Sequence, residues 1–166
     1  MIVLVGFMGA GKTTVGREVA RTLGVPFTDA DRAIETQAGR PIRQIFADDG
    51  EPAFRELERQ VITALLSRPG EAVLALGGGA AENPAIAAAL AGHEVVFLQI
   101  SLDDALARVG YDTGRPMLRS PDLPGLFERR QDSYAALAAI TVRVGAGRGA
   151  DEVSAEIVGR LRPGRG

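Results

Sequence analysis

The sequence predicts an α/β fold in which parallel strands are joined by crossover helices. Short apolar runs alternate along the chain with amphipathic stretches, which is typical of a largely parallel sheet. The length of 166 residues suits one hydrophobic core, and no internal repeat or linker divides the chain. We therefore expect one domain over residues 1–166.

Five apolar runs are expected to form the strands of this sheet. They lie at residues 2–5, 26–28, 72–76, 94–100 and 141–144. The first run is apolar throughout, as in a strand buried on both faces. The third run leads directly into three consecutive glycines, which form either a flexible turn or a backbone that approaches a ligand closely.

The amphipathic stretches between the runs are expected to be helices. Residues 52–67 give the clearest pattern, because apolar residues recur at helical spacing and Pro52 suits a first turn. The other helices are expected at residues 12–23, 31–38, 42–48, 84–91, 103–108, 126–139 and 151–161. Residues 110–124 are instead rich in Gly, Pro, Asp and Arg, which predicts a mobile functional loop over about these residues.

Composition argues against several classes of function. The 19 basic and 21 acidic residues are scattered along the chain, so no basic stripe favours nucleic acid. Cysteine is absent, which excludes disulfides and thiolate metal sites, and the apolar runs are far shorter than the ~20 residues of a membrane span. The chain starts on an apolar strand without a basic leader. We expect a cytoplasmic protein with no membrane partner, and the short chain of mixed charge favours a monomer.

Residues 6–13, Gly-Phe-Met-Gly-Ala-Gly-Lys-Thr, match the phosphate-loop pattern. Glycines let backbone N–H groups surround phosphate oxygens, the lysine reaches the terminal phosphates and the threonine hydroxyl binds Mg²⁺. Lys12 is also the only lysine among the 19 cationic residues. The sequence therefore predicts a site for a nucleotide and Mg²⁺. The expected ATP-binding residues of this segment are Gly9, Ala10, Gly11, Lys12, Thr13 and Thr14.

Exclusion narrows the class of phosphate-loop protein. Guanine-specific switches need an Asn-Lys-x-Asp segment, which cannot exist here because Lys12 is the only lysine. Motor-type ATPases keep an aspartate at the end of an apolar strand, where this chain has glycine after Leu76. A second glycine pattern at residues 145–150 formally fits a dinucleotide site, but the chain ends before the strand and acidic residue that such a site requires. We expect these residues to form a loop near the nucleotide base, and small kinases remain as the leading class.

A small kinase must bind its acceptor with its own side chains. In an extended segment, Asp29 and Asp31 would point to opposite sides, so one could face Mg²⁺ and the other the acceptor hydroxyl. Asp31 could instead be only a helix N-cap, and Arg55 could be a solvated surface residue. Arg115 in the mobile loop could cover the transferring phosphoryl group or lie in a plain exposed loop.

In combination, these segments resemble the shikimate kinases over nearly the whole chain. The matching residues are 6–17, Asp29 to Asp31, 46–58, 76–79, 115–118, and Arg130-x-x-x-Tyr134-x-x-x-Ala138. The phosphate loop alone would not distinguish this family, whereas six segments in this order and spacing are highly specific. The resemblance implies a three-layer α/β/α fold with a five-stranded parallel sheet of order 2-3-1-4-5 and a mobile lid, as in the nucleoside-monophosphate kinases.

The resemblance also implies an activity, the ATP-dependent phosphorylation of the 3-hydroxyl of shikimate, with Mg²⁺ as cofactor. Asp31 then resembles the carboxylate that orients the acceptor hydroxyl, and Asp29 resembles the one that supports Mg²⁺ through water. Arg55 and Arg130 resemble the pair that binds the shikimate carboxylate. The remaining implied roles belong to Gly77, Gly78 and Gly79 at the substrate, to Arg115 at the phosphates, and to Arg108 and Arg148 near adenine.

Two alternatives stay open at this point. A kinase for another small hydroxy acid, such as gluconate, would share the fold and the phosphate loop, although the arginine pair and the triple glycine favour shikimate. A non-catalytic ATP-binding module on the same fold would be a protein of a different class. The intact set of Lys12, Thr13, Asp29, Asp31 and Arg115 argues against that second alternative.

Overall fold

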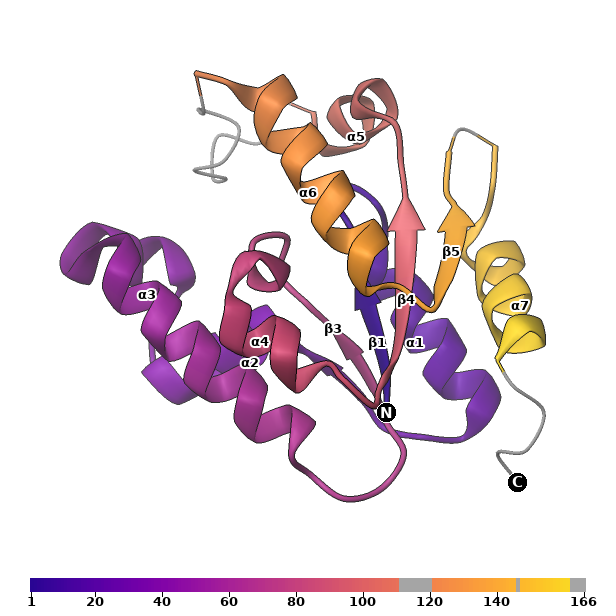
Figure 1. Ribbon diagram of the computed structural model, residues 1–166, viewed down its shortest axis with the longest axis horizontal. Helices are drawn as coiled ribbons and strands as arrows, with labels where there is room; N and C mark the ends of the chain where they lie inside the picture. The colour runs from indigo at the N-terminus through magenta and orange to yellow at the C-terminus, as the bar shows by residue number, and fades with distance from the viewer. Residues whose placement is uncertain (111–120, 146, 162–166) are drawn as a thin grey trace.

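The computed structural model describes residues 1–110, 121–145 and 147–161. Their strands form one parallel sheet in the order β2-β3-β1-β4-β5 (Figure 1). The strands are β1 (Ile2–Val5), β2 (Phe27–Asp29), β3 (Val73–Ala75), β4 (Glu94–Gln99) and β5 (Ile140–Arg143). The sheet order and the parallel direction confirm the fold expected from the resemblance.

Helices lie on both faces of this sheet. They are α1 (Lys12–Leu23), α2 (Ala30–Ala38), α3 (Ile42–Leu66), α4 (Pro84–Ala89), α5 (Leu102–Val109), α6 (Leu123–Leu137), α7 (Ala150–Arg160) and the 3₁₀ turn η1 (Ala80–Glu82). Helices α1 and α7 pack against each other on one face, whereas α4 and α6 lie over the other (Figure 1). No helix of the described residues is long and apolar enough to cross a membrane.

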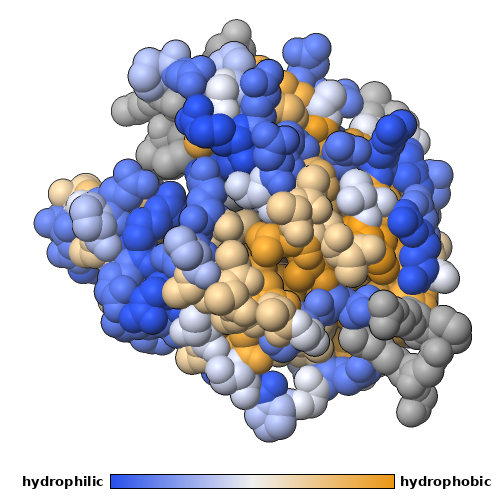
Figure 2. Space-filling view, in the orientation of Figure 1, coloured by the Kyte–Doolittle hydropathy of each residue, from blue (hydrophilic) through white to orange (hydrophobic). Residues whose placement is uncertain are grey.

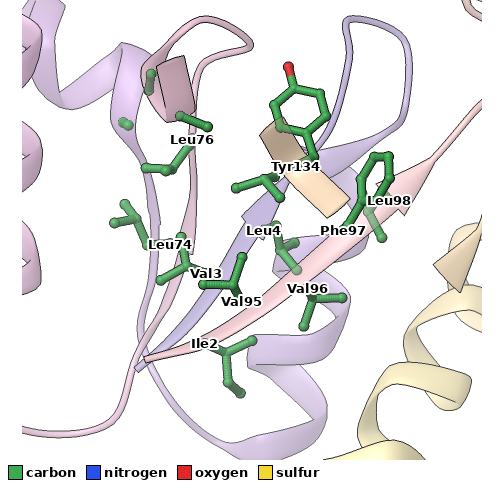
Figure 3. Packing of buried hydrophobic residues seen from close by; sticks show 14 of the residues in the cluster. Ile2, Val3, Leu4, Leu74, Leu76, Val95, Val96, Phe97, Leu98 and Tyr134 are labelled. Atoms are coloured by element: carbon green, nitrogen blue, oxygen red, sulfur yellow. The ribbon is translucent and has the colours of Figure 1, made fainter. Parts of the chain in front are cut away.

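The core lies where the central strands meet these two helical layers. Strands β1 and β3 are buried along their whole length, as expected for parallel strands covered on both faces. Leu4 and Phe97 from neighbouring strands lie close to Tyr134 of α6 (Figure 3). In the space-filling view, hydrophilic side chains cover much of α3 at the left, whereas hydrophobic side chains gather over the middle of this face (Figure 2). The sheet therefore forms a rigid base, and its carboxyl-terminal edge carries the loops that hold the site.

Two expected helices, at residues 42–48 and 52–67, form the single element α3 with an interruption. Gly50 has a φ of 83° and a ψ of 171°, a conformation outside the helical region that a side chain would strain. Just before this break, Asp48 and Asp49 pair with Arg40 from the loop that follows α2. The two expected helices are therefore confirmed as two helical pieces that meet at a kink, and ion pairs lie beside the kink.

The boundary between β2 and α2 also differs from the expectation. The strand ends at Asp29, and this residue is the N-cap of α2, since its Oδ1 accepts hydrogen bonds from the backbone N–H groups of Asp31 and Arg32 at 3.1 and 3.3 Å. Asp31 therefore lies in the first helical turn. Its expected place in an extended segment was wrong, and so was the alternative that Asp31 is the N-cap.

Part of the expected lid has a regular structure. Helix α6 begins at Leu123, within the loop expected at residues 110–124 and three residues before the predicted helix. Asp122 caps this helix by accepting a hydrogen bond of 3.1 Å from the N–H of Gly125. Residues 111–120, which include Arg115, lie outside the described residues.

Candidate active site

The phosphate loop joins β1 to α1 at the carboxyl-terminal edge of the sheet. Gly9 and Gly11 have φ values of 78° and 86°, in the left-handed region that favours glycine. A Cβ on Gly9 would also lie 2.9 Å from the carbonyl oxygen of Ala105. Lys12 folds back over the loop, and its Nζ donates hydrogen bonds to the carbonyl oxygens of Gly6 and Phe7 at 2.7 and 3.1 Å. The loop is thus preformed, with an ammonium group at the start of a helix.

A pocket of about 780 Å³ extends from the phosphate loop across the strand ends to α3. The predicted site residues that line it are Gly9, Gly11, Lys12, Thr13, Thr14, Asp29, Asp31, Arg55, Gly77, Gly78, Gly79, Arg108 and Arg130. Ala10 is buried in the core and does not line the pocket. Residues from six separate segments of the chain therefore meet around one space that is large enough for small-molecule ligands.

The end of the pocket beside the phosphate loop carries hydroxyl and carboxylate oxygens. The hydroxyl of Thr13 donates a hydrogen bond of 2.6 Å to Oδ2 of Asp29. Asp31 also lines the pocket, beside the triple glycine, and its Oδ1 is 2.6 Å from the place that a Cβ on Gly77 would occupy. Both aspartates therefore line one pocket, although they do not point to opposite sides of an extended strand.

The opposite end of the pocket holds two guanidinium groups. Atoms Nη1 of Arg55 and Nη2 of Arg130 lie 2.7 and 3.0 Å from the place that a Cβ on Gly79 would occupy. Arg130 is only 3% exposed, and Arg55 is 27% exposed with its Cζ 5.2 Å from the centre of the Phe54 ring. Arg55 is therefore not a solvated surface residue. A Cβ at position 79 would therefore require the guanidinium groups to shift from these positions.

Each of these arginines has a carboxylate partner that the sequence interpretation did not assign to the site. Arg55 pairs with Glu58 at 2.8 Å, and Arg130 pairs with Glu82 at 3.0 Å. Burial raises the pKa of Glu58 against the opposing effect of Arg55. The spacing of Glu58 three residues after Arg55 could have indicated the first pair, but no local pattern connects Glu82 with Arg130.

Tyr134 is another residue without an assigned role in the sequence interpretation. Its hydroxyl donates a hydrogen bond to the carbonyl oxygen of Gly78, and its ring is fully buried against Phe97. Burial raises the pKa of the hydroxyl well above its usual range, so it remains protonated and continues to donate. This contact connects α6 with the triple glycine and helps to fix the backbone at the acceptor end of the pocket.

The two arginines expected near adenine have different surroundings. Arg108 donates hydrogen bonds to the carbonyl oxygens of Gly9 at 3.3 Å and Gly145 at 2.7 Å, and so joins the phosphate loop to the loop after β5. Arg148 does not line the pocket. It donates to the carbonyl oxygen of Arg143 at 2.7 Å and pairs with Glu156 of α7 at 2.9 Å. The structure therefore brings Arg108, but not Arg148, to the predicted site.

Comparisons with known proteins agree with this geometry. The family model for shikimate kinase matches residues 8–162. A shikimate kinase of Thermobifida fusca is 46% identical over 170 residues, covering 100% of this chain and 96% of the relative. The solved shikimate kinase of Acinetobacter baumannii, in complex with shikimate, superposes with a TM-score of 0.89 at 37% identity and covers 97% of this chain and 94% of its own.

A more distant structure bears on the gluconate alternative. A gluconokinase of Sinorhizobium meliloti superposes with a TM-score of 0.55, covering 95% of this chain and 89% of its own. Its sequence identity of 22% is low, so the likeness shows only a common fold. Together with the family model and the close relatives, the phosphate loop and the paired arginines show that the chain belongs to the shikimate kinase family.

Proposed function

We propose that this chain transfers the terminal phosphoryl group of ATP to the 3-hydroxyl of shikimate. The observation that carries this proposal is the convergence of Arg55 and Arg130 on Gly79, in the pocket that begins at the phosphate loop. Two guanidinium groups directed at one point match a carboxylate, which shikimate carries. An acceptor bound there would extend toward Asp31 and the phosphates of ATP.

ATP occupies the phosphate-loop end of the pocket in this proposal. The backbone N–H groups of Gly9, Ala10 and Gly11 surround phosphate oxygens, while Lys12 moves from the carbonyl groups that it now contacts to the terminal phosphates. Thr14 follows at the start of α1, and Arg108 lies beside the base. We retain Arg115 as a lid residue at the phosphates and Arg148 as a more remote candidate near adenine.

Mg²⁺ is the cofactor that fits the oxygen donors at this end. The hydroxyl of Thr13 and the carboxylate of Asp29 lie within 2.6 Å of each other and both line the pocket. Magnesium is bound in such sites by one or two protein oxygens together with phosphates and water. It would supply positive charge that offsets the charge of the phosphates. Thr13 would bind the ion, and Asp29 would orient a bound water.

The chain's own contribution to the reaction is mainly positioning. Phosphoryl transfer needs the acceptor oxygen in line with the leaving oxygen, and little covalent work is required of the protein. Asp31 would accept a hydrogen bond from the acceptor hydroxyl, orient its oxygen and accept its proton as the bond to phosphorus forms. The backbone of Gly77 and Gly78 would bind the acceptor closely. Lys12 and Arg115 would offset the charge on the transferring group.

The same pocket bears on the two alternatives to a shikimate kinase. Gluconate also has a carboxylate and hydroxyl groups, but the only evidence in its favour is a shared fold. A non-catalytic ATP-binding module would not need Arg55 and Arg130, two largely buried arginines that lie away from the phosphate loop in the same pocket. We further propose that residues 1–166 act as a single domain and as a cytoplasmic monomer, without nucleic-acid or membrane partners.

The decisive experiment is coupled detection of ADP release by the purified chain with ATP and Mg²⁺. Shikimate, gluconate and no acceptor are compared, with the phosphorylated product identified by mass spectrometry. Release with shikimate alone supports the proposal. Release with gluconate alone moves the activity to the other acid, and ATP binding without acceptor-dependent release favours the non-catalytic module.

A further inference from the structure

We propose that Glu82 is a positioning residue for Arg130, and through it for the acceptor carboxylate. This role rests on the proposed function, in which Arg130 and Arg55 bind that carboxylate. Glu82 does not line the pocket, so it acts on the acceptor only through the arginine. Glu82 belongs to the turn η1, accepts a hydrogen bond from Arg130, and so orients an arginine that lies beside a second cation, Arg55.

Glu82 has a well-defined place in the fold. It ends η1, the turn that follows the triple glycine, and its backbone N–H donates a hydrogen bond of 3.1 Å to the carbonyl oxygen of Gly79. Ala81 before it is buried. Asn83 after it caps α4, accepting a hydrogen bond of 2.9 Å from the N–H of Ala85. The carboxylate is thus attached to a turn that is fixed on both sides.

This carboxylate holds one side of the Arg130 guanidinium. Nε of Arg130, on α6, donates a hydrogen bond of 3.0 Å to Oε2 of Glu82. Its Cζ lies 6.0 Å from the centre of the Phe7 ring. With Nε directed at Glu82, Nη1 and Nη2 face Gly78 and Gly79, lying 3.4 and 3.0 Å from the Cβ positions built on those glycines. The edge that would meet an acceptor carboxylate is therefore aimed by Glu82.

A neighbouring cation makes this carboxylate necessary. The Arg55 guanidinium lies on the same glycine as that of Arg130, and like charges this close repel each other. Arg55 pairs with Glu58 at 2.8 Å, and Arg130 pairs with Glu82 at 3.0 Å while its charge also acts on Glu58. Loss of the Glu82 charge would remove the contact that directs Nε of Arg130, so the guanidinium would turn away from Arg55. Glu82 therefore helps to keep the guanidinium of Arg130 beside that of Arg55, where both can bind the acceptor carboxylate.

The test is Glu82→Gln, which removes the charge and keeps the shape. We expect the KM for shikimate to rise about fivefold or more, while kcat and the KM for ATP stay within about twofold. Glu82→Asp should recover most of the affinity. The matched control is Glu18→Gln on α1, because Glu18 also pairs with an arginine and its side chain is 30% exposed, against 35% for Glu82.

The outcomes separate this role from a structural one and from the proposed function. Because Arg130 is 3% exposed whereas Arg21 is 73% exposed, the Tm of Glu82→Gln should fall more than that of Glu18→Gln. The kinetic constants are therefore measured well below both Tm values, and the selective change in the KM for shikimate identifies the positioning role. An unchanged KM for shikimate in Glu82→Gln overturns the positioning role. An equal rise in the KM for ATP also overturns it. Failure of the unmodified chain to phosphorylate shikimate overturns the proposed function itself, and the role of Glu82 with it.

Discussion

The hydroxyl of Thr13 and the carboxylate of Asp29 are joined by a hydrogen bond of 2.6 Å, although they come from different elements of the fold. Thr13 lies in the first turn of α1, and Asp29 lies between β2 and α2. The two oxygens of Asp29 have separate tasks, because Oδ1 caps α2 while Oδ2 faces Thr13. A substitution of Asp29 can therefore separate helix capping from the proposed role in binding Mg²⁺.

Asp29→Asn should retain the fold and impair the use of Mg²⁺. Asparagine caps helices about as well as aspartate, so the free energy of unfolding should change by less than about 0.5 kcal/mol. Loss of the carboxylate should raise the Mg²⁺ concentration needed for half-maximal rate by about tenfold or more. Urea unfolding and a Mg²⁺ titration of the rate measure the two effects. An unchanged Mg²⁺ requirement would contradict the metal role.

Lys12→Ala should abolish turnover while the protein stays folded. The ammonium group is expected to offset charge on the transferring phosphoryl group, and losing such a group costs about 10²–10³-fold in rate or more. The rate is measured by ADP release and the fold by circular dichroism. Arg21→Ala provides the control, because Arg21 is an exposed cation of the same helix that pairs only locally with Glu18. Near-normal activity of Lys12→Ala would remove the lysine from the reaction.

Gly79→Ala should weaken acceptor binding without unfolding the protein. The φ of Gly79 is −93°, which alanine adopts easily, but the new Cβ would lie 2.7 Å from Nη1 of Arg55. The flexible arginine ends must move apart, so we expect the KM for shikimate to rise about tenfold. Gly159→Ala in α7 is the matched control, since its Cβ would meet no atom within 4 Å. Equal KM values for the two variants would show that the arginine positions do not matter.

Arg55→Gln should make stability strongly dependent on pH. Burial already raises the pKa of Glu58 above its ordinary value of 4.5, and Asp31 raises it further, while Arg55 and Arg130 oppose the shift. Without Arg55 the pKa rises more, so the folded state holds a proton that the unfolded state has lost. The contribution of Glu58 to the free energy of unfolding is then fully present below a pH of about 4.5, its ordinary pKa. It falls as the pH rises toward the higher pKa of the folded state.

We expect the variant to lose about 1–3 kcal/mol relative to the unmodified chain at a pH of about 7.5, and much less at about 4.5. Urea unfolding at both pH values gives the difference. A second substitution, Glu58→Gln, should remove this pH dependence because the carboxyl group that titrates is no longer present. The same loss at both pH values would mean that Glu58 is not the group responsible.

Sequence patterns were sufficient for the strands and the phosphate loop because both depend on local residue types, whereas the order of the strands in the sheet came from the family resemblance. The apolar run at Ile2–Val5 and the glycines that follow it indicate a buried strand and a loop without any knowledge of the rest of the chain. The two helical pieces of α3 were also predicted correctly, because the backbone at Gly50 lies outside the helical region and separates them. The ion pairs of Arg40 with Asp48 and Asp49 beside this break were not predicted, since they join different segments.

The residues that sequence reasoning missed at the site are those whose role depends on contacts between distant segments. Glu58 and Glu82 would each be taken for a solvated charge on a helix or turn. Their roles depend on the arginines with which they form ion pairs in the folded chain. Arg148 is a further example, since the adenine role proposed for it comes from the family resemblance, whereas its ion pair with Glu156 of α7 could not be predicted from the sequence. Arginine patterns give the charge of a residue but not its partner.

The position of the only lysine also has a practical consequence. A reagent that acylates primary amines has a single side-chain target in this chain, the Nζ of Lys12, which lies in the proposed ATP site. The N-terminal amine also reacts, so the label is quantified on the peptide that contains Lys12, and its extent would fall as nucleotide fills the pocket. Occupancy could be followed in this way in an intact protein, without turnover and without an engineered label.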